Sequence, residues 1–120
     1  MSDFDNKPAR MDLPTIKQGD TLRAIQFNGS GTNAALTRVR CKIKDADGNT
    51  LLSLDSNTSG ITIDDSTAGA WQYTISAITA ANTATIASGL HNYDIETTDA
   101  DGIVETHFEG NWEITPQITD

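Results

Sequence analysis

The chain has 120 residues, a net charge of −9 and one cysteine, Cys41. This length suits one domain with its own core, and a single cysteine excludes an internal disulfide. The acidic balance argues against nucleic acid as a partner, because phosphate binding needs clustered cations. No run approaches the roughly 18 apolar residues of a membrane-spanning helix, so we expect no membrane partner.

Residues 1–14 are predicted to form an extended N-terminal arm. They mix charged residues and prolines with isolated apolar residues, and they show neither strand nor helix periodicity. Such a segment is disordered alone or docks in extended form on another surface. We expect Phe4, Met11 and Leu13 to be its partner-binding anchors, each lying in a groove of a neighbour.

Residues 15–120 are predicted to form one domain of short strands. About eight or nine apolar or alternating runs recur at a spacing of roughly 8–12 residues, separated by turns rich in Gly, Asp and Asn. Thr79–Ala87 is rich in Ala and lacks Gly and Pro, which predicts one short crossover helix. This pattern is typical of an all-β sandwich or barrel.

A basic ribbon occupies alternate positions of the strand predicted over Thr37–Lys44, namely Arg38, Arg40, Lys42 and Lys44. All eight Lys and Arg residues lie at or before Lys44 with four acids, a net charge of +4, whereas residues 45–120 carry thirteen acids and no Lys or Arg, a net charge of −13. Either the ribbon pairs with acidic strands of its own sheet, or it meets the acidic surface of a neighbouring copy or partner. Both interpretations are compatible.

The clearest hairpin is predicted between Leu90 and Thr115, around an Asp-Ala-Asp-Gly turn. Apolar and polar residues alternate on both sides of this turn, which indicates one buried and one solvated face. The alternation assigns these residues to the buried face: Tyr93, Ile95, Thr97, Val104, Thr106, Phe108, Trp112 and Ile114. It places His107 on the solvated face with Glu105 and Glu109.

Motifs for catalysis or metal binding are not complete. The run from Asp45 resembles the opening of a calcium loop, but Ser56 stands where the loop needs a bidentate Glu, and the run from Asp99 has Gly110 there. Two histidines and one cysteine are too few for a zinc site. The sequence contains no nucleophile elbow, phosphate loop or dinucleotide fingerprint. We therefore expect no enzymatic activity, no metal and no cofactor.

The order of turns and core positions resembles small structural proteins of tailed bacteriophages. The matching segments are Ile16–Leu22, Gly60–Ile63, Trp71–Ile75, Gly89–Ile95 and Gly110–Ile114, within residues 15–120. They are similar to the immunoglobulin-like β-sandwich domain at the N-terminus of baseplate upper proteins and in minor tail or head proteins. The resemblance implies an immunoglobulin-like antiparallel sandwich and a non-enzymatic role in virion assembly. It transfers no binding residues.

We therefore expect a virion structural or assembly protein of a tailed bacteriophage, in its tail, baseplate or neck or as a head-associated adaptor, assembled in the host cytoplasm. Its expected partners are other virion proteins and further copies of itself. The partner-binding residues would be Phe4, Met11, Leu13, Arg38, Arg40, Lys42 and Lys44. The alternative is a carbohydrate-binding or adhesin-like module, which exposed aromatic residues would favour. Trp71, Tyr73, Phe108 and Trp112 instead fit core positions.

Overall fold

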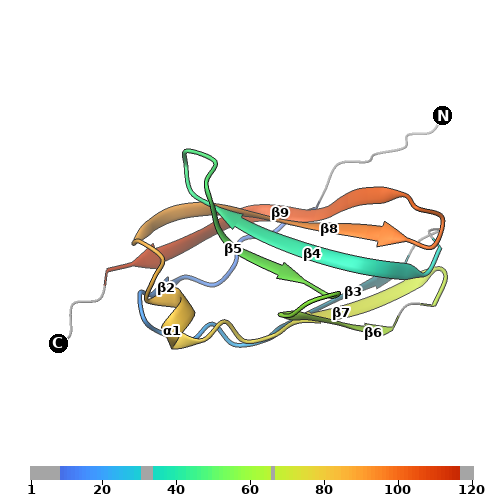
Figure 1. The fold of residues 1–120 in the computed structure, drawn as a ribbon, viewed down its shortest axis with the longest axis horizontal. Helices are drawn as coiled ribbons and strands as arrows, with labels where there is room; N and C mark the ends of the chain where they lie inside the picture. Colours follow the sequence, from blue (N-terminus) through green and yellow to red (C-terminus); the bar gives the residue numbers. More distant parts are fainter. Residues whose placement is uncertain (1–8, 31–33, 66, 117–120) are drawn as a thin grey trace.

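The computed structural model describes residues 9–30, 34–65 and 67–116. Within these ranges the chain forms short and long strands around one small helix (Figure 1). The elements are β1 (Ala9–Arg10), β2 (Ile16–Lys17), β3 (Ile25–Ser30), β4 (Leu36–Lys44), β5 (Thr50–Asp55), β6 (Ile61–Asp65), β7 (Ala70–Ile75), α1 (Ala80–Thr83), β8 (Gly89–Asp99) and β9 (Val104–Thr115).

The strands form two sheets packed face to face (Figure 1). The larger sheet has the order β1-β9-β8-β4-β5, with β2 also paired to β9, and the smaller sheet has the order β3-β7-β6. Every strand pair is antiparallel except β1 and β2 on β9, which are parallel. The strands β4 and β5 share one sheet with the final hairpin, β8 and β9, while β3, β6 and β7 form the other sheet, a division typical of immunoglobulin-like sandwiches. The predicted fold class, an immunoglobulin-like antiparallel β-sandwich with one short crossover helix, is confirmed.

The core lies between the sheets and follows strand alternation. On β4, Val39, Cys41 and Ile43 point inward and are buried, while the residues between them point to solvent. Trp112 on β9 and Tyr73 on β7 are the largest fully buried side chains. Because burial removes apolar area from water at about 25 cal/mol per Å², these aromatic residues contribute strongly to stability.

The segment from Ala9 to Lys17 lies along the free edge of β9. Met11 N–H donates to Glu109 O at 2.9 Å, and Leu13 N–H donates to Asn111 O at 2.9 Å. The Leu13 side chain is buried in the core, with 5% of its surface exposed. The expectation that Leu13 binds a neighbouring molecule is therefore wrong. The segment hydrogen-bonds to the edge of β9 in its own chain, and Leu13 is buried in the core of that chain. Met11 is 37% exposed, and Phe4 lies outside the described residues.

Gly110 permits this docking because the Met11 backbone occupies the space of a side chain. A Cβ added to Gly110 would overlap the Met11 carbonyl oxygen. Tyr93 lies opposite Gly110 on β8, and its hydroxyl donates a hydrogen bond to that same carbonyl. The absence of a side chain at residue 110 thus lets the N-terminal segment approach the sheet closely.

The crossover between β7 and β8 contains α1, which is shorter than the predicted Thr79–Ala87. Thr79 caps it, since its side chain accepts from Asn82 N–H. Thr83, buried on α1, donates to the Asp20 carbonyl at 2.7 Å, which fixes the helix against the loop after β2. Among the described residues, no helix is long and apolar enough to cross a membrane.

A β-bulge in β9 changes the predicted faces of the last hairpin. Ile95 pairs with Phe108, but Glu96 pairs with Thr106, so His107 is the extra residue of β9. His107 consequently packs on Trp71, with ring centroids 4.8 Å apart, instead of lying in solvent. Val104 is 53% exposed. The predicted positions of Val104, Thr106 and His107 are therefore wrong, because strict alternation does not anticipate an inserted residue.

Replacing Trp112 by Ala is expected to lower the free energy of unfolding by about 3–5 kcal/mol, because the fully buried indole would leave a cavity. The measurement is urea denaturation followed by far-UV circular dichroism. Leu90→Ala is the control, since Leu90 is 60% exposed and its loss should cost about 0.5 kcal/mol or less. Equal effects of both substitutions would contradict the assigned core.

Two substitutions at nearby positions, Leu13 and Met11, test whether the N-terminal segment docks on its own chain. Leu13→Ala should cost about 2–5 kcal/mol, because Leu13 is buried in the core of its own chain. Met11→Ala should cost about 1 kcal/mol or less, because Met11 is partly exposed and contributes mainly its backbone. Chemical denaturation of both variants measures how much stability each substitution costs. If Leu13→Ala is as stable as the wild type, the segment does not dock intramolecularly.

Candidate functional site

The outward side chains of the larger sheet form a surface that we call the charged face. They point to solvent because they alternate with the buried residues of the same strands. The charged face consists of Arg10 on β1; Glu109, Asn111 and Glu113 on β9; Asn92, Asp94 and Glu96 on β8; Arg38, Arg40, Lys42 and Lys44 on β4; and Ser53 and Asp55 on β5.

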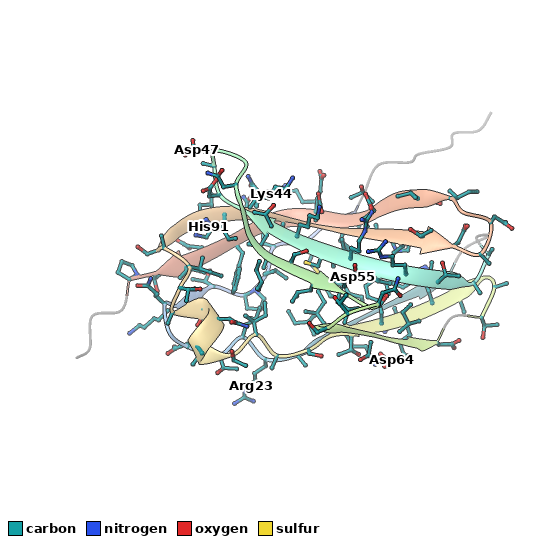
Figure 2. The ribbon with its side chains drawn as sticks, in the orientation of Figure 1. Arg23, Lys44, Asp47, Asp55, Asp64 and His91 are labelled. Atoms are coloured by element: carbon teal, nitrogen blue, oxygen red, sulfur yellow. The ribbon has the colours of Figure 1, made fainter. Side chains whose placement is uncertain are left out.

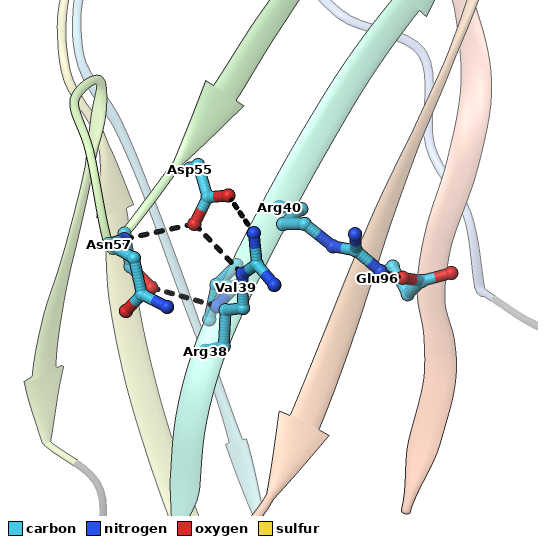
Figure 3. A network of polar contacts seen from close by, with 7 residues as sticks. Arg38, Val39, Arg40, Asp55, Asn57 and Glu96 are labelled. Carbon is cyan, nitrogen blue, oxygen red and sulfur yellow. Dashed lines mark hydrogen bonds and ion pairs between the residues drawn. The ribbon is translucent and has the colours of Figure 1, made fainter.

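Arg38 binds an acid of its own sheet. Its guanidinium donates to both carboxylate oxygens of Asp55, at 3.1 and 2.5 Å (Figure 3). The Asn57 backbone N–H donates to the same carboxylate at 2.9 Å. The hydrogen bond from Arg38 holds the pKa of Asp55 below its ordinary value, and burial opposes this only in part. Arg38 therefore fixes the end of the β5 edge strand.

Arg40 is also paired within the chain, with Glu96 directly across from it on β8 (Figure 3). Both side chains remain about one-third exposed, at 32% and 33%. Ion pairs at such exposure contribute about 0–1 kcal/mol, so this pair adds little to stability. For Arg38 and Arg40, the intramolecular interpretation of the basic ribbon matches the structure.

Lys42 and Lys44 differ from the two arginines. Among the described residues, neither lysine forms an ion pair within 4 Å or donates a side-chain hydrogen bond. Lys42 lies opposite Asp94 and Lys44 lies opposite Asn92 in the register of β4 and β8. Their ammonium groups therefore remain available to a partner, which is the second interpretation of the ribbon.

Two shallow hollows adjoin these lysines. One has a volume of about 260 Å³ and reaches from Lys42 and Lys44 to Arg10 and Glu109. The other, about 160 Å³, lies between Lys42, Lys44, Arg40 and the acids of β8. Both hollows are lined by Lys42, Lys44 and Asp94, so these three residues stand at the centre of the charged face.

In the turns that begin at Asp45 and Asp99, the carboxylate of the first residue accepts hydrogen bonds from the backbone of its own turn. Asp45 Oδ1 accepts from the backbone N–H groups of Asp47 and Asn49, each at 2.9 Å. Asp99 Oδ1 does the same for Asp101 and Ile103, at 2.9 and 3.0 Å. The described part of the chain has no group of three His, Cys, Asp or Glu residues placed to hold a metal ion. Turn formation thus accounts for the calcium-loop resemblance.

Two side chains of reactive residue types, Cys41 and His107, pack in or against the core. Burial, the larger effect, together with the charge of Asp94, raises the pKa of the Cys41 thiol to about 12, so the thiol stays protonated. His107 packs on Trp71, and its Nδ1 is 3.4 Å from the Tyr73 hydroxyl. Burial lowers the pKa of His107, and the nearby charge of Glu105 opposes that shift. Both residues serve packing.

Aromatic side chains are buried or half-buried throughout the described residues. Trp112, Tyr73, Tyr93 and Phe27 are buried, and Trp71 and Phe108 pack against the core. Sugar-binding modules stack an exposed aromatic ring on the sugar, and the described chain presents no such ring. The predicted core positions of Tyr73 and Trp112 are confirmed, and Trp71 and Phe108 are partly buried against that core.

Sequence reasoning did not identify three residues of the charged face as binding residues: Arg10, Asp94 and Glu109. The alternation of β8 and β9 shows that both acids point outward, which is the available signal. No sequence pattern places Arg10 beside them. Arg10 reaches this surface because β1 pairs with β9 in parallel, opposite Glu109.

No protein-family model matches this chain, and no curated protein matches it. Among solved structures, the chain is similar to CopC from Methylosinus trichosporium OB3b, at 10% identity and a TM-score of 0.49, over 94% of this chain and 88% of that one. It is also similar to fibronectin(III)-like modules of Clostridium thermocellum CbhA, at 13% identity and a TM-score of 0.36, over 92% and 91%. Both TM-scores are below 0.5, so neither similarity bears on what the chain does.

The buried position of His107 predicts a pH dependence of stability. An unfolded His titrates near 6.5 and the folded one below that value, so the unfolded state binds more protons in mild acid. The wild type should lose stability as the pH falls below about 6.5, and His107→Gln should lose less. Thermal melting of both proteins between about pH 7.5 and about pH 5.5 measures the difference. Parallel curves would show that His107 is not desolvated.

Proposed function

We propose that this chain is a non-enzymatic structural protein of a tailed bacteriophage virion. It assembles in the host cytoplasm with other virion proteins and with further copies of itself. The proposal draws on the sequence resemblance of residues 15–120 and on the charged face. The observation that carries it is that Lys42 and Lys44, which form no ion pair among the described residues, lie beside hollows that also expose Asp94 and Glu109.

The charged face suits protein assembly because it combines fixed and free charges. Arg38 and Arg40 are held by Asp55 and Glu96, which keeps the surface rigid. Lys42 and Lys44 project from that surface without an internal ion pair among the described residues. Free charges at a protein surface steer encounter and select partners more than they add affinity. The finer location within the tail, baseplate, neck or head is part of the expectation from the resemblance.

The proposal is tested on tailed particles from a host that produces the chain with Lys44→Glu. Particles are purified in a density gradient, and mass spectrometry measures the number of copies per particle. The wild type should be present in a fixed ratio to the other particle proteins, and Lys44→Glu should reduce that ratio about tenfold. Arg23→Glu is the matched control: it makes the same change of charge, and Figure 2 shows Arg23 on the opposite side of the molecule from Lys44.

The control variant should be incorporated as well as the wild type. Absence of the wild-type chain from purified particles would overturn the proposal. Equal loss of both variants would show that net charge, and not the charged face, governs incorporation.

A further inference from the structure

A band of four charges crosses the charged face at one level along the strands. Lys42 lies opposite Asp94, Asp94 opposite Glu109, and Glu109 opposite Arg10. The signs therefore run plus, minus, minus, plus. No two of these four residues form an ion pair with each other within 4 Å in the described structure. Asp94 and Glu109 are like charges directly across a strand pair, an arrangement that is destabilising by itself.

We propose that two copies of this chain bind each other through their charged faces, about a two-fold axis that runs along the strands between β4 and β8. This inference rests on the proposed function, since it names one of the partners as a second copy and specifies the surface. In this arrangement Lys42 and Asp94 of each copy are neutralised by Asp94 and Lys42 of the other copy.

The register of the strands determines what such an axis brings together. Rotation about an axis parallel to the strands keeps each residue at its level and exchanges β4 with β8. Lys42 of each copy then lies over Asp94 of the other, because these residues share a level. Arg40 of each copy likewise lies over Glu96 of the other copy. The four side chains then form a square in which positive and negative charges alternate. The interface is isologous, so each favourable contact occurs twice.

Several other two-fold axes along the strands bring like charges together at this level. An axis on β4 places Lys42 over Lys42, and an axis on β8 places Asp94 over Asp94, although it also places Lys42 over Glu109. An axis between β8 and β9 places Asp94 over Glu109 and Lys42 over Arg10. An axis between β4 and β5 leaves Lys42 over the uncharged Ser53. An axis between β9 and β1 also pairs opposite charges, Glu109 over Arg10, but it overlaps only these two edge strands. Among the axes that overlap four or more strands, the β4/β8 axis alone pairs opposite charges in this band without a like-charge contact, which is how charge patterns give specificity.

The same rotation covers an exposed apolar side chain. Lys44 shares a level with Asn92, and both the turn after Lys44 and Leu90, which is 60% exposed, lie beyond that level. The β4–β5 turn stands above the larger sheet (Figure 1), and the rotation brings it over Leu90 of the other copy. Covering Leu90 adds apolar burial to the charge pairs.

The size of the face indicates a weak dimer. Four strands at about 4.8 Å spacing and nine residues of β4 at about 3.4 Å each cover roughly 19 by 30 Å, or about 570 Å² per copy. A stable interface buries about 800 Å² per partner, so the dimer needs high concentration or low salt. Crowding of copies within a particle supplies the concentration.

The test is sedimentation equilibrium of the full chain at about 0.02 M and about 0.5 M salt. The wild type should form dimers whose dissociation constant rises about tenfold or more at the higher salt. Lys42→Glu and Asp94→Lys should each weaken the dimer about tenfold, while their equimolar mixture should restore it. Restoration on mixing follows from the axis, because residue 42 of one copy lies over residue 94 of the other in both contacts.

Arg23→Glu is the control, with the same change of charge as Lys42→Glu on an exposed residue outside the charged face. It should change the dissociation constant by about twofold or less. Thermal melting verifies that each variant is folded, and Lys42→Gln and Asp94→Asn replace the charge reversals if those unfold. A monomeric wild type, a mixture that stays monomeric, or equal weakening by Arg23→Glu would overturn the inference.

Particle analysis separates this inference from the proposed function. If the wild type is monomeric in solution yet present in purified particles, the two-fold contact is wrong and the virion role stands. If the wild type forms the salt-dependent dimer but is absent from particles, the two-fold contact stands and the virion role fails.

Discussion

The hydrogen bond from the indole N–H of Trp112 to the Pro14 carbonyl, 3.0 Å long, joins the centre of the core to the start of the fold. Trp112 is fully buried, so its N–H needs a partner, and Pro14 supplies one from the segment that lies along β9. Satisfying that donor holds Leu13 in the core and Arg10 at the surface. The sandwich and the charged face therefore depend on the same contact.

The two sheets contribute differently to the surface. The outer side of the smaller sheet presents mainly uncharged groups, where Asp64 accepts hydrogen bonds from Gln26 and Thr74. The larger sheet concentrates its charges on β4, β8 and β9, with arginines fixed by acids and lysines left free. A rigid sheet holds these groups at set spacings. Register, and not loop conformation, then determines which charges meet.

Local sequence patterns predicted most of the fold because alternation and turn residues act over short distances. The burial of Cys41 and Trp112 follows from the period of two, and the Asp turns form as their side chains dictate. His107 was misplaced because the bulge in β9 depends on its pairing with β8, which no short window contains. Leu13 was misplaced for a related reason: its partner strand is nearly a hundred residues away in sequence. At the charged face, alternation identified the basic ribbon, but only the structure divides it into paired arginines and free lysines.

The parallel pairing of the first described strand with the last has a consequence for synthesis. Asp12 and Asn111, joined by a hydrogen bond, are 99 residues apart. During translation the N-terminal segment emerges before its docking edge is made, so the sandwich cannot close until the ribosome has produced β9. Until then, β8 would present an open edge able to pair with other chains. A premature stop before β9 would leave Leu13 without its site, so it would yield aggregation-prone fragments and not shortened functional proteins.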